Sequence, residues 1–463
     1  MNTPSETAYL PQTDRLGLLH RGISVVMVLI LMVFLSVFVS QLEPKIGLVI
    51  MVVCTFIGGK RLLSPNIWPL IAITGYGAAL SLFFPGPRPE IGTIIEHPLF
   101  VLDCILLTSL VQGGQSIRRQ YLLLLGMLFI SVIGAVGDWT GHDMTALLPF
   151  EMPDDDVVNV IILQQGNLVR IRGFFTEGGV LGAVAIGVAT MIVMGACVML
   201  KFRVSIRYAW FGLLSALGMG GAILLIAVTK SGFVMTAAGV FGFTAVFLIS
   251  RNAHCRAIAI LLLVASIVGG TAFLFLGPST ITSYLRGEIV ASIDPRGMTR
   301  QDMGGHAGVL TRYKCWILAF NSIRQYPLGV GVYGLGSVIH SVGDVGFTRE
   351  MRYFFSRDNF GLKNALANLI AQTGLPGLAL LGYWLFVAFL GPIRTLLKDA
   401  SLRSTFIAGI YGASAVSCIV FLFSCELYPS FAFLLVLKFH ADAVAQACLP
   451  KPSPNNEAFE LIA

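Results

Sequence analysis

Apolar positions along this chain come in long uninterrupted runs, separated by polar connections that are mostly short. Twelve runs of about 14 to 25 residues can be counted. At a rise of 1.5 Å per residue, about 20 apolar residues cross the roughly 30 Å hydrocarbon core of a membrane. The pattern therefore predicts an all-α, polytopic membrane protein with about twelve transmembrane helices. The predicted spans are residues 23–40, 46–59, 66–85, 98–113, 121–137, 174–200, 208–229, 232–250, 257–277, 366–390, 404–425 and 428–447.

Basic residues indicate how these spans are oriented. Every connection that follows an even-numbered span is short and basic, whereas the odd-to-even connections among the early spans carry only Lys45 and Arg88. Positive charge accumulates on the cytoplasmic side, so both termini are predicted to be cytoplasmic. The prediction requires that the second run crosses, although at about 21 Å it is short enough for a re-entrant segment. The basic residues are Arg15, Arg21, Lys60, Arg61, Arg118, Arg119, Lys201, Arg203, Arg207, Arg251, Arg256, Arg394, Lys398 and Arg403.

Two odd-to-even connections are long, and both are predicted to face outward. They contain most of the soluble-like sequence, which makes them and the adjoining helix ends the expected location of function. The predicted organisation is a cytoplasmic N-terminus at 1–22, spans one to nine over 23–277 with an outer loop at 138–173, a large helical periplasmic loop at 278–365, three spans over 366–447 and a cytoplasmic tail at 448–463.

Composition supports the membrane class and argues against two other classes. Of the 463 residues, 56% are hydrophobic and 12% are charged, about half the charged share of an average soluble protein. The basic cytoplasmic connections account for the net charge of +7, so no nucleic-acid partner is predicted. The eight cysteines form no Cys-x-x-Cys or Cys/His pattern, and the outer histidines lack the spacing of metal ligands. We therefore predict no metal and no other cofactor.

The long outer loop contains one clear amphipathic pattern, at residues 308–326. Large apolar residues recur there every three or four positions, and polar residues occupy the other faces. We expect a helix that lies at the membrane surface or caps the bundle. The loop is also basic, which indicates an anionic partner or contact with anionic lipid headgroups. The apolar stripe is Val309, Leu310, Tyr313, Trp316, Ile317, Phe320 and Ile323.

A glycine motif follows that helix. Gly329, Gly331 and Gly334 match GxGxxG, but the motif binds nucleotides only between a strand and a helix of a βαβ unit. We interpret it as a turn at the membrane surface.

Charged residues gather where the predicted spans meet the outer side. Arginine and lysine side chains bind phosphate oxygens, which suits a diphosphate substrate, and a carboxylate such as Glu177 can act as a general base. Alternatively, Glu177 only neutralises Arg170 or Arg172, although its spacing of five from Arg172 differs from the three or four that favours pairing on one helix face. The gathered residues are Asp103, Arg170, Arg172, Glu177, Lys230, Arg312, Lys363 and Glu426.

Four stretches resemble motifs of the O-antigen polymerase and ligase superfamily. They are similar, respectively, to its arginine–glycine–aromatic stretch, its serine-centred stretch, its arginine–tryptophan helix with a following proline–glycine segment, and its polar pair before a glycine-containing helix. Their order and spacing also match, over roughly residues 170–390. The stretches are "RIRGFFTEGGVLG", "TKSGFVMTAAGVFGF", "RYKCWILAFNSIRQYPLGVGVYG" and "LKNALANLIAQTGLPGLALL".

The resemblance implies metal-independent glycosyl transfer on the periplasmic side of a bacterial inner membrane. The donor would be a glycan on undecaprenyl diphosphate, the acceptor a second lipid-linked glycan, and membrane lipid and other polysaccharide assembly proteins would be further partners. Glu177 and Arg172 are the predicted catalytic residues. The predicted substrate-binding residues are Arg170, Lys230, Arg312, Lys363 and Asn364, of which Asn364 is assigned by the resemblance alone.

Departures from the superfamily pattern decide between its activities. Ligases have His-Asn where this chain has Lys363-Asn364, and the Ser-Arg of the serine-centred stretch is here Ser231-Gly232. The missing histidine favours a polymerase of O-antigen or exopolysaccharide repeat units over a ligase that transfers glycan to lipid A core. A transporter or lipid-linked-glycan flippase is the other alternative. It would be expected to have internal repeats, broken helices and charges near the membrane midplane, whereas the charges noted in this sequence gather on the outer side.

Overall fold

The structure is a computed structural model. Within the residues that it describes, the chain is helical and contains no β-strand, which confirms the predicted all-α class for this part of the protein. The described residues are 64–83, 91–142, 144, 178–227, 230–276, 302–332, 334–335, 364–399, 401–424 and 427–449.

Each predicted span that falls within the described residues coincides with a helix, and 23–40 and 46–59 lie outside them. Two boundaries differ by more than a few residues. The helix predicted at 98–113 begins seven residues earlier with Pro98 inside it, and the one predicted at 366–390 continues through a π-helical turn to Lys398. The helices are α3 Trp68–Phe83, α4 Ile91–Gln112, α5 Ile117–Trp139, α7 Gly178–Lys201, α8 Ile206–Ala227, α9 Lys230–Ile249, α10 Ala253–Leu276, α12 Asp302–Gln325, α15 Ala365–Leu385, the π-helical turn η3 Phe386–Leu390, α16 Gly391–Lys398, α17 Leu402–Ser424 and α18 Leu427–Cys448.

By length and composition, six segments of the described residues can cross a membrane. Three shorter apolar helices accompany them, and together these helices make the protein membrane-embedded. The twelve-span count stays a prediction. The six segments are Ile117–Trp139, Leu181–Lys201, Ser231–Ile249, Ala365–Lys398, Leu402–Phe423 and Phe431–Cys448, and the shorter helices are Trp68–Phe83, Val101–Gln112 and Ala253–Gly269.

Side-chain contacts fix the relative directions of the central helices. α9 runs antiparallel to α17, because Ser250 meets Thr405 (3.3 Å between hydroxyl oxygens) at one end and Gly242 meets Gly412 further along. α7 runs parallel to α9, since the Thr190 hydroxyl lies 3.2 Å from that of Thr236 and the contacts advance together along both helices.

α18 completes the centre of the bundle. It runs parallel to α7, with Gly187 facing Phe433 and Gly195 facing His440. The termini of α7, α9, α17 and α18 therefore lie at the same two ends of the bundle.

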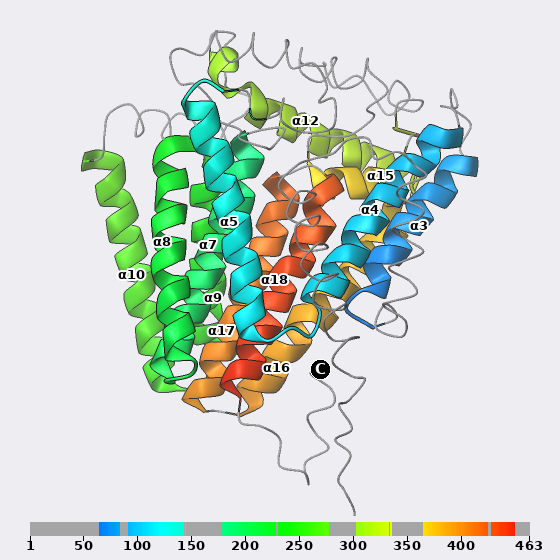
Figure 1. Ribbon diagram of the computed structural model, residues 1–463. Coiled ribbons are helices and arrows are strands. Elements are labelled where there is room, and N and C mark those ends of the chain that lie inside the picture. Colours follow the sequence, from blue (N-terminus) through cyan, green and yellow to red (C-terminus); the bar gives the residue numbers. More distant parts are fainter. Residues whose placement is uncertain are drawn as a thin grey trace, which may run out of the picture.

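One end of the bundle is crossed by α12 (Figure 1). Trp316 of α12 lies with its ring centroid 5.1 Å from that of Phe423, one residue before the end of α17. Because α7, α9 and α18 run opposite to α17, all three begin at this end. We call it the α12 end.

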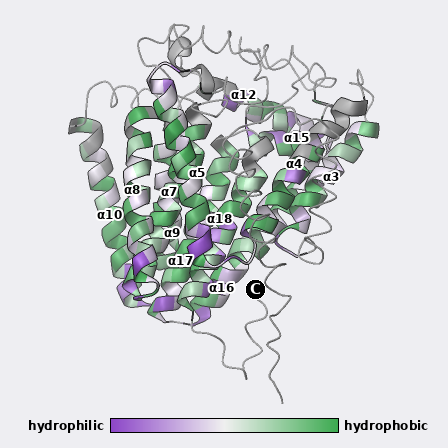
Figure 2. Ribbon diagram, viewed as in Figure 1, coloured by the Kyte–Doolittle hydropathy of each residue, from purple (hydrophilic) through white to green (hydrophobic). Residues whose placement is uncertain are grey.

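The opposite end carries the basic turns. Phe202, between α7 and α8, packs edge-on against Phe406 of α17 (5.6 Å between centroids), and the Arg403 guanidinium lies 5.2 Å from the Phe202 ring centroid. Hydrophilic segments gather at this end in Figure 2, whereas the flanks of the bundle are mostly hydrophobic. We call it the basic end; its basic residues are Arg118, Arg119, Lys201, Arg203, Arg207, Arg251, Arg256, Arg394, Lys398 and Arg403.

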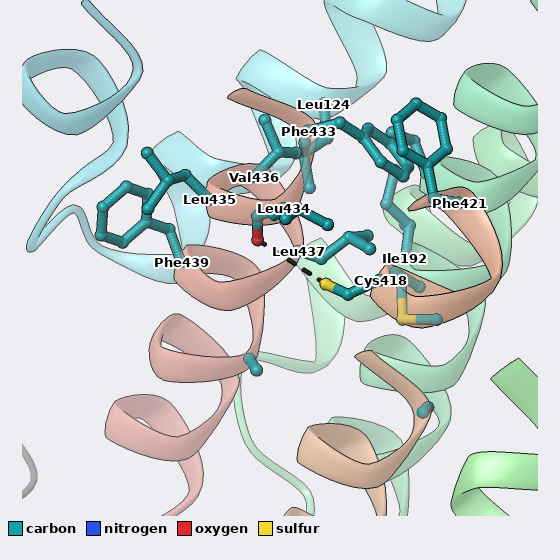
Figure 3. Close-up of a cluster of buried hydrophobic side chains, with 14 of the residues drawn as sticks. Leu124, Ile192, Cys418, Phe421, Phe433, Leu434, Leu435, Val436, Leu437 and Phe439 are labelled. Carbon is teal, nitrogen blue, oxygen red and sulfur yellow. Dashed lines mark hydrogen bonds between the residues drawn. The ribbon is translucent and has the colours of Figure 1, made fainter. Parts of the chain in front are cut away.

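The core is centred on α18, which is buried along most of its described length. Figure 3 shows Leu124 of α5, Ile192 of α7 and Phe421 of α17 around Phe433 of α18. The rings of Phe421 and Phe433 lie 4.2 Å apart, and the Cys418 thiol lies 4.0 Å from the Leu434 carbonyl oxygen. Large side chains thus fill the space on this side of α17.

On its other side α17 packs backbone to backbone against α9. A Cβ atom built at Gly242 would lie 2.3 Å from the carbonyl oxygen of Gly412, and one at Gly412 would lie 2.4 Å from a methyl of Val246. Lipid tails are as apolar as leucine, so membrane helices associate through such close packing of small residues rather than through the hydrophobic effect.

We expect Gly242→Ala and Gly412→Ala to force α9 and α17 apart and to lower stability by about 1–3 kcal/mol, the usual cost of overpacking. The measurement is the thermal unfolding midpoint of the purified protein in detergent. Gly218→Ala on α8 is the matched control, because a Cβ atom there meets nothing within 4 Å. Equal midpoints for Gly242→Ala and Gly218→Ala would contradict the close approach.

Candidate functional site

The α12 end gathers the starts of several helices. α7, α9 and α18 begin there, and α15 joins them because the Asn364 amide nitrogen donates to the Phe423 carbonyl at the end of α17 (2.7 Å). The N-terminus of a helix presents unpaired N–H groups and a partial positive charge, which favours anions. Four such ends together make this a suitable place for an anionic substrate.

The structure describes some of the predicted site residues and not others. Arg170, Arg172, Glu177 and Lys363 lie outside the described residues. Gly178, which follows Glu177 in the chain, begins α7 at the α12 end. The convergence of Arg170, Arg172, Glu177 and Lys363 stays a prediction.

Lys230 is the first residue of α9. The contacts between α9 and α17 pair residue 242 with 412 and 250 with 405, so the antiparallel register places Lys230 level with the last residues of α17. The backbone of Lys230 therefore lies at the α12 end, as the proposed site requires.

Arg312 lies on α12, which packs on the first half of α15 through small side chains. The buried face of α12 consists of Cys315, Leu318, Ala319 and Ser322, and it meets Ala367 and Ala371 of α15. The expected cap on the bundle is thus confirmed. The predicted apolar stripe is packed in part: Trp316 and Ile323 are half-buried against the same cluster, and Phe320 is 56% exposed. Small residues allow α12 to approach α15 closely, and the large side chains occupy its flank.

The side chain of Arg312 is half-buried, with its Nε atom buried. One turn further along α12, Trp316 contacts Phe423, whose carbonyl accepts the hydrogen bond from Asn364. Arg312 and Asn364, two of the predicted binding residues, are therefore linked through one turn of α12, one aromatic contact and one hydrogen bond. The structure brings their helices together.

The side chain of Asn364 is hydrogen-bonded within the fold. It is 1% exposed and is the N-cap of α15, where its side-chain oxygen accepts from the Ala367 N–H (3.0 Å). Since its amide nitrogen donates to Phe423, both ends of the amide have partners. The polar pair assigned by resemblance thus contains one residue with a clear structural role, which is to tie the start of α15 to the end of α17.

α15 is broken in its middle. Gly374 has φ 59° and ψ −150°, a conformation available almost only to glycine, and Pro376 follows within the helix. Such a break leaves backbone groups without helical partners, which is costly away from water.

The glycine loop at 327–331 supplies the missing partners. Val330 N–H donates to the Ala371 carbonyl (3.2 Å), Gly331 N–H donates to that of Gln372 (2.9 Å), and Leu375 N–H donates to the Pro327 carbonyl (2.8 Å). Gly329 and Gly331 also have positive φ, 92° and 79°. The turn predicted at GxGxxG is therefore present, but it is a buried turn that completes a broken helix.

Polar side chains reinforce this arrangement from α3 and α15. The Ser81 hydroxyl accepts from Val332 N–H (2.7 Å), and the Gln372 amide donates to Asn368 (3.1 Å) and to the Val332 carbonyl (3.4 Å). A cavity of about 20 Å³ lies beside Gln372, between α3, α4, α15 and α18. It is large enough for about one water molecule.

An ionisable group in the middle of α18 was not identified from the sequence. Lys438 pairs with Asp442, and the Tyr411 hydroxyl of α17 donates to the same carboxylate (2.7 Å). The signal was present, because "LKFHAD" places three ionisable residues within five positions of a predicted span. It was missed because charges were sought only at the ends of the predicted spans.

No metal ligand set appears among the described residues, where no three His, Cys, Asp or Glu side chains come together. The chain matches no protein-family model and no curated protein.

We expect Asn364→Ala to destabilise the protein by about 1 kcal/mol for the lost cap, and further because the Phe423 carbonyl loses its donor. Asn364→Ser should recover the cap, but its shorter side chain should not restore the bond to Phe423. Thermal unfolding midpoints should therefore rank wild type, then serine, then alanine. Identical midpoints for wild type and Asn364→Ala would refute the structural role.

We also expect Gly374→Ala to destabilise the α12 end by about 1–3 kcal/mol, because the added Cβ would lie 2.2 Å from the Pro327 carbonyl oxygen in a strained backbone. Gly382→Ala, in the same helix with nothing within 4 Å, is the matched control and should unfold at or above the wild-type midpoint. An unchanged midpoint for Gly374→Ala would show that the break is dispensable.

Proposed function

We propose that the protein is a metal-independent glycosyltransferase that polymerises polysaccharide repeat units, of O-antigen or exopolysaccharide, carried on undecaprenyl diphosphate. In this proposal the α12 end faces the periplasm of a bacterial inner membrane and the basic end faces the cytoplasm, where both termini lie. The proposal takes its reaction class from the resemblance of the four sequence stretches.

One observation carries the proposal: four helices begin at the α12 end, directly beside a helix that bears Arg312. Helix starts and guanidinium groups both favour phosphate oxygens. The chain positions next to these starts are Glu177, Lys230 and Lys363, so an anionic lipid-linked substrate would meet the predicted charged residues there. Positive charge at the opposite end supports the proposed orientation.

The reaction divides the roles among these residues. The hydroxyl oxygen of the acceptor glycan attacks the anomeric carbon of the donor, the bond from that carbon to the diphosphate oxygen breaks, and undecaprenyl diphosphate leaves. Arg170, Arg172 and Arg312, with Lys230, would stabilise the negative charge of the leaving diphosphate. Glu177 would accept the proton of the attacking hydroxyl.

Two observations favour a transporter or flippase as a second candidate. α15 is discontinuous, and Lys438 and Asp442 lie in the middle of a membrane helix. Both features recur in secondary transporters. We keep polymerisation first because the charges next to the helix starts at the α12 end match a diphosphate.

We expect Glu177→Gln, Arg172→Ala and Arg312→Ala each to abolish or strongly shorten the polymer, by at least tenfold in long-chain product, while lipid-linked single repeats accumulate. The measurement is surface polysaccharide length on gels, together with analysis of extracted lipid-linked glycans in cells that depend on this protein. Arg324→Ala, on an exposed part of the same α12, is the matched control and should leave chain length unchanged.

The outcomes separate the alternatives. Unchanged chain lengths in Glu177→Gln and Arg172→Ala would exclude the catalytic assignment. Polymer of normal length that no longer reaches lipid A core would indicate the ligase. Lipid-linked repeats that accumulate only on the cytoplasmic face would indicate a flippase.

A further inference from the structure

An ion pair lies deep inside the bundle, remote from the proposed active site. Lys438 is the twelfth residue of the 22-residue α18, so it lies about 15 Å from either end of that helix. Its side chain is 3% exposed, and Nζ donates to Asp442 Oδ1 one turn further along. Tyr411 of α17 is fully buried and donates its hydroxyl to the same oxygen at 2.7 Å.

The three groups are arranged around a single carboxylate oxygen. Lys438 Nζ also lies 5.5 Å from the Tyr411 ring centroid, so the ammonium is held by the carboxylate and by the aromatic face together. Both donors use Oδ1, and among the described residues no partner contacts Oδ2. One carboxylate oxygen is therefore available for a proton.

Burial falls off from Lys438 toward the basic end. The Asp442 side chain is 18% exposed against 3% for Lys438, and Gln446, one turn further, is exposed. Because residues 438, 442 and 446 share one helix face, a polar stripe connects the buried pair with the end of α18. The carboxylate, and not the ammonium, is the group that is approached from this end.

Stability alone does not account for this group. When an ion pair is buried, the hydration free energy that it loses is about as large as the attraction between its charges. Apolar residues of similar size therefore commonly stabilise a fold as well or better. Ionisable residues inside membrane spans are accordingly associated with proton relays and ion pathways.

Other titratable groups near α18 have different partners. His440 points to α5, where its ring stacks on Tyr121 with 5.9 Å between centroids. Arg403 of α17 lies over Phe202. Among the described residues, α4, α5, α7 and α15, which also pack on α18, provide no hydrogen-bond or ion-pair partner for Asp442.

We propose that Tyr411, Lys438 and Asp442 form a proton-binding site inside the membrane part of the protein, reached from the basic end. Asp442 takes up a proton on its free oxygen, Lys438 loses the charge that it faces, and the hydrogen bond from Tyr411 weakens. Proton binding thereby loosens the contact between α17 and α18. This site is independent of the proposed glycosyl transfer.

The test is the infrared difference spectrum of the purified protein in lipid as pH is lowered. We expect Asp442→Asn to remove one component of the C=O band of protonated carboxylic acids that wild type shows. Asp103→Asn, which removes a fully buried carboxylate on α4, should keep that component. A pH-dependent spectrum that Asp442→Asn leaves unchanged would overturn the proposal.

Two donor variants test the geometry. Tyr411→Phe removes one donor to the carboxylate, and Lys438→Met removes the positive charge. Both should therefore move the midpoint of the band to higher pH, Lys438→Met further. A midpoint that both variants leave unchanged would also overturn the proposal.

Folding and the side of access need separate controls. Lys438→Met combined with Asp442→Leu replaces the pair by apolar residues and should fold without the Asp442 component, which distinguishes a lost site from a lost fold. In vesicles whose protein orientation is established by cleavage of a C-terminal tag, a pH step on the side of the basic end should drive the band. A response to a step on the α12 side alone would refute the assigned access.

Discussion

Backbone hydrogen bonding without water is the constraint on which the α12 end depends. A membrane helix that breaks must find partners for its freed N–H and C=O groups inside the protein, and α15 finds them in the loop that follows α12. Three backbone hydrogen bonds, to the carbonyls of Ala371, Gln372 and Pro327, hold this loop against the broken helix. The Tyr76 hydroxyl of α3 donates to the Leu328 carbonyl at 2.9 Å and thereby joins α3 to the same layer. The position of α12, and with it Arg312, follows from this layer.

Much of the fold could be predicted from the sequence, because long apolar runs and short basic turns are properties of the chain itself. The helices from α3 to α18 lie where these runs indicated, and the contacts of Phe202 and Ser250 bring basic turns to one end. The break in α15 was less accessible. "TGLPG" is an ordinary helix-breaking sequence, but only the partner loop, some forty residues earlier, determines that the break is kept and buried.

The candidate site could be predicted in part, and the misses have physical causes. Charge beside an apolar run indicated Lys230 and Arg312, whose helices the structure brings to one end of the bundle. Asn364 was assigned to substrate binding by resemblance, yet its amide forms hydrogen bonds with Ala367 and Phe423. The cap on Ala367 is a local interaction that the sequence can indicate. The bond to Phe423 joins residues far apart in the chain, so the sequence does not indicate it. The hydrophobic stripe of α12 did not indicate that Cys315 and Ala319 pack against α15, since close approach depends on small side chains. Lys438 and Asp442 lie four positions apart in one span, so the pair was visible in the sequence, but charge was expected only at the ends of the spans.

The anchoring of α12 has a consequence for the length of the chain between α12 and α15. Leu335 is buried with Ala367, Ile370 and Ala371, and Asn364 caps the same helix, so the described residues on either side of segment 336–363 both lie at the first turns of α15. A segment whose flanking residues are fixed close together can change in length at little cost, because closure entropy grows only with the logarithm of length. Insertions between Leu335 and Asn364 should thus leave the described helices unaltered.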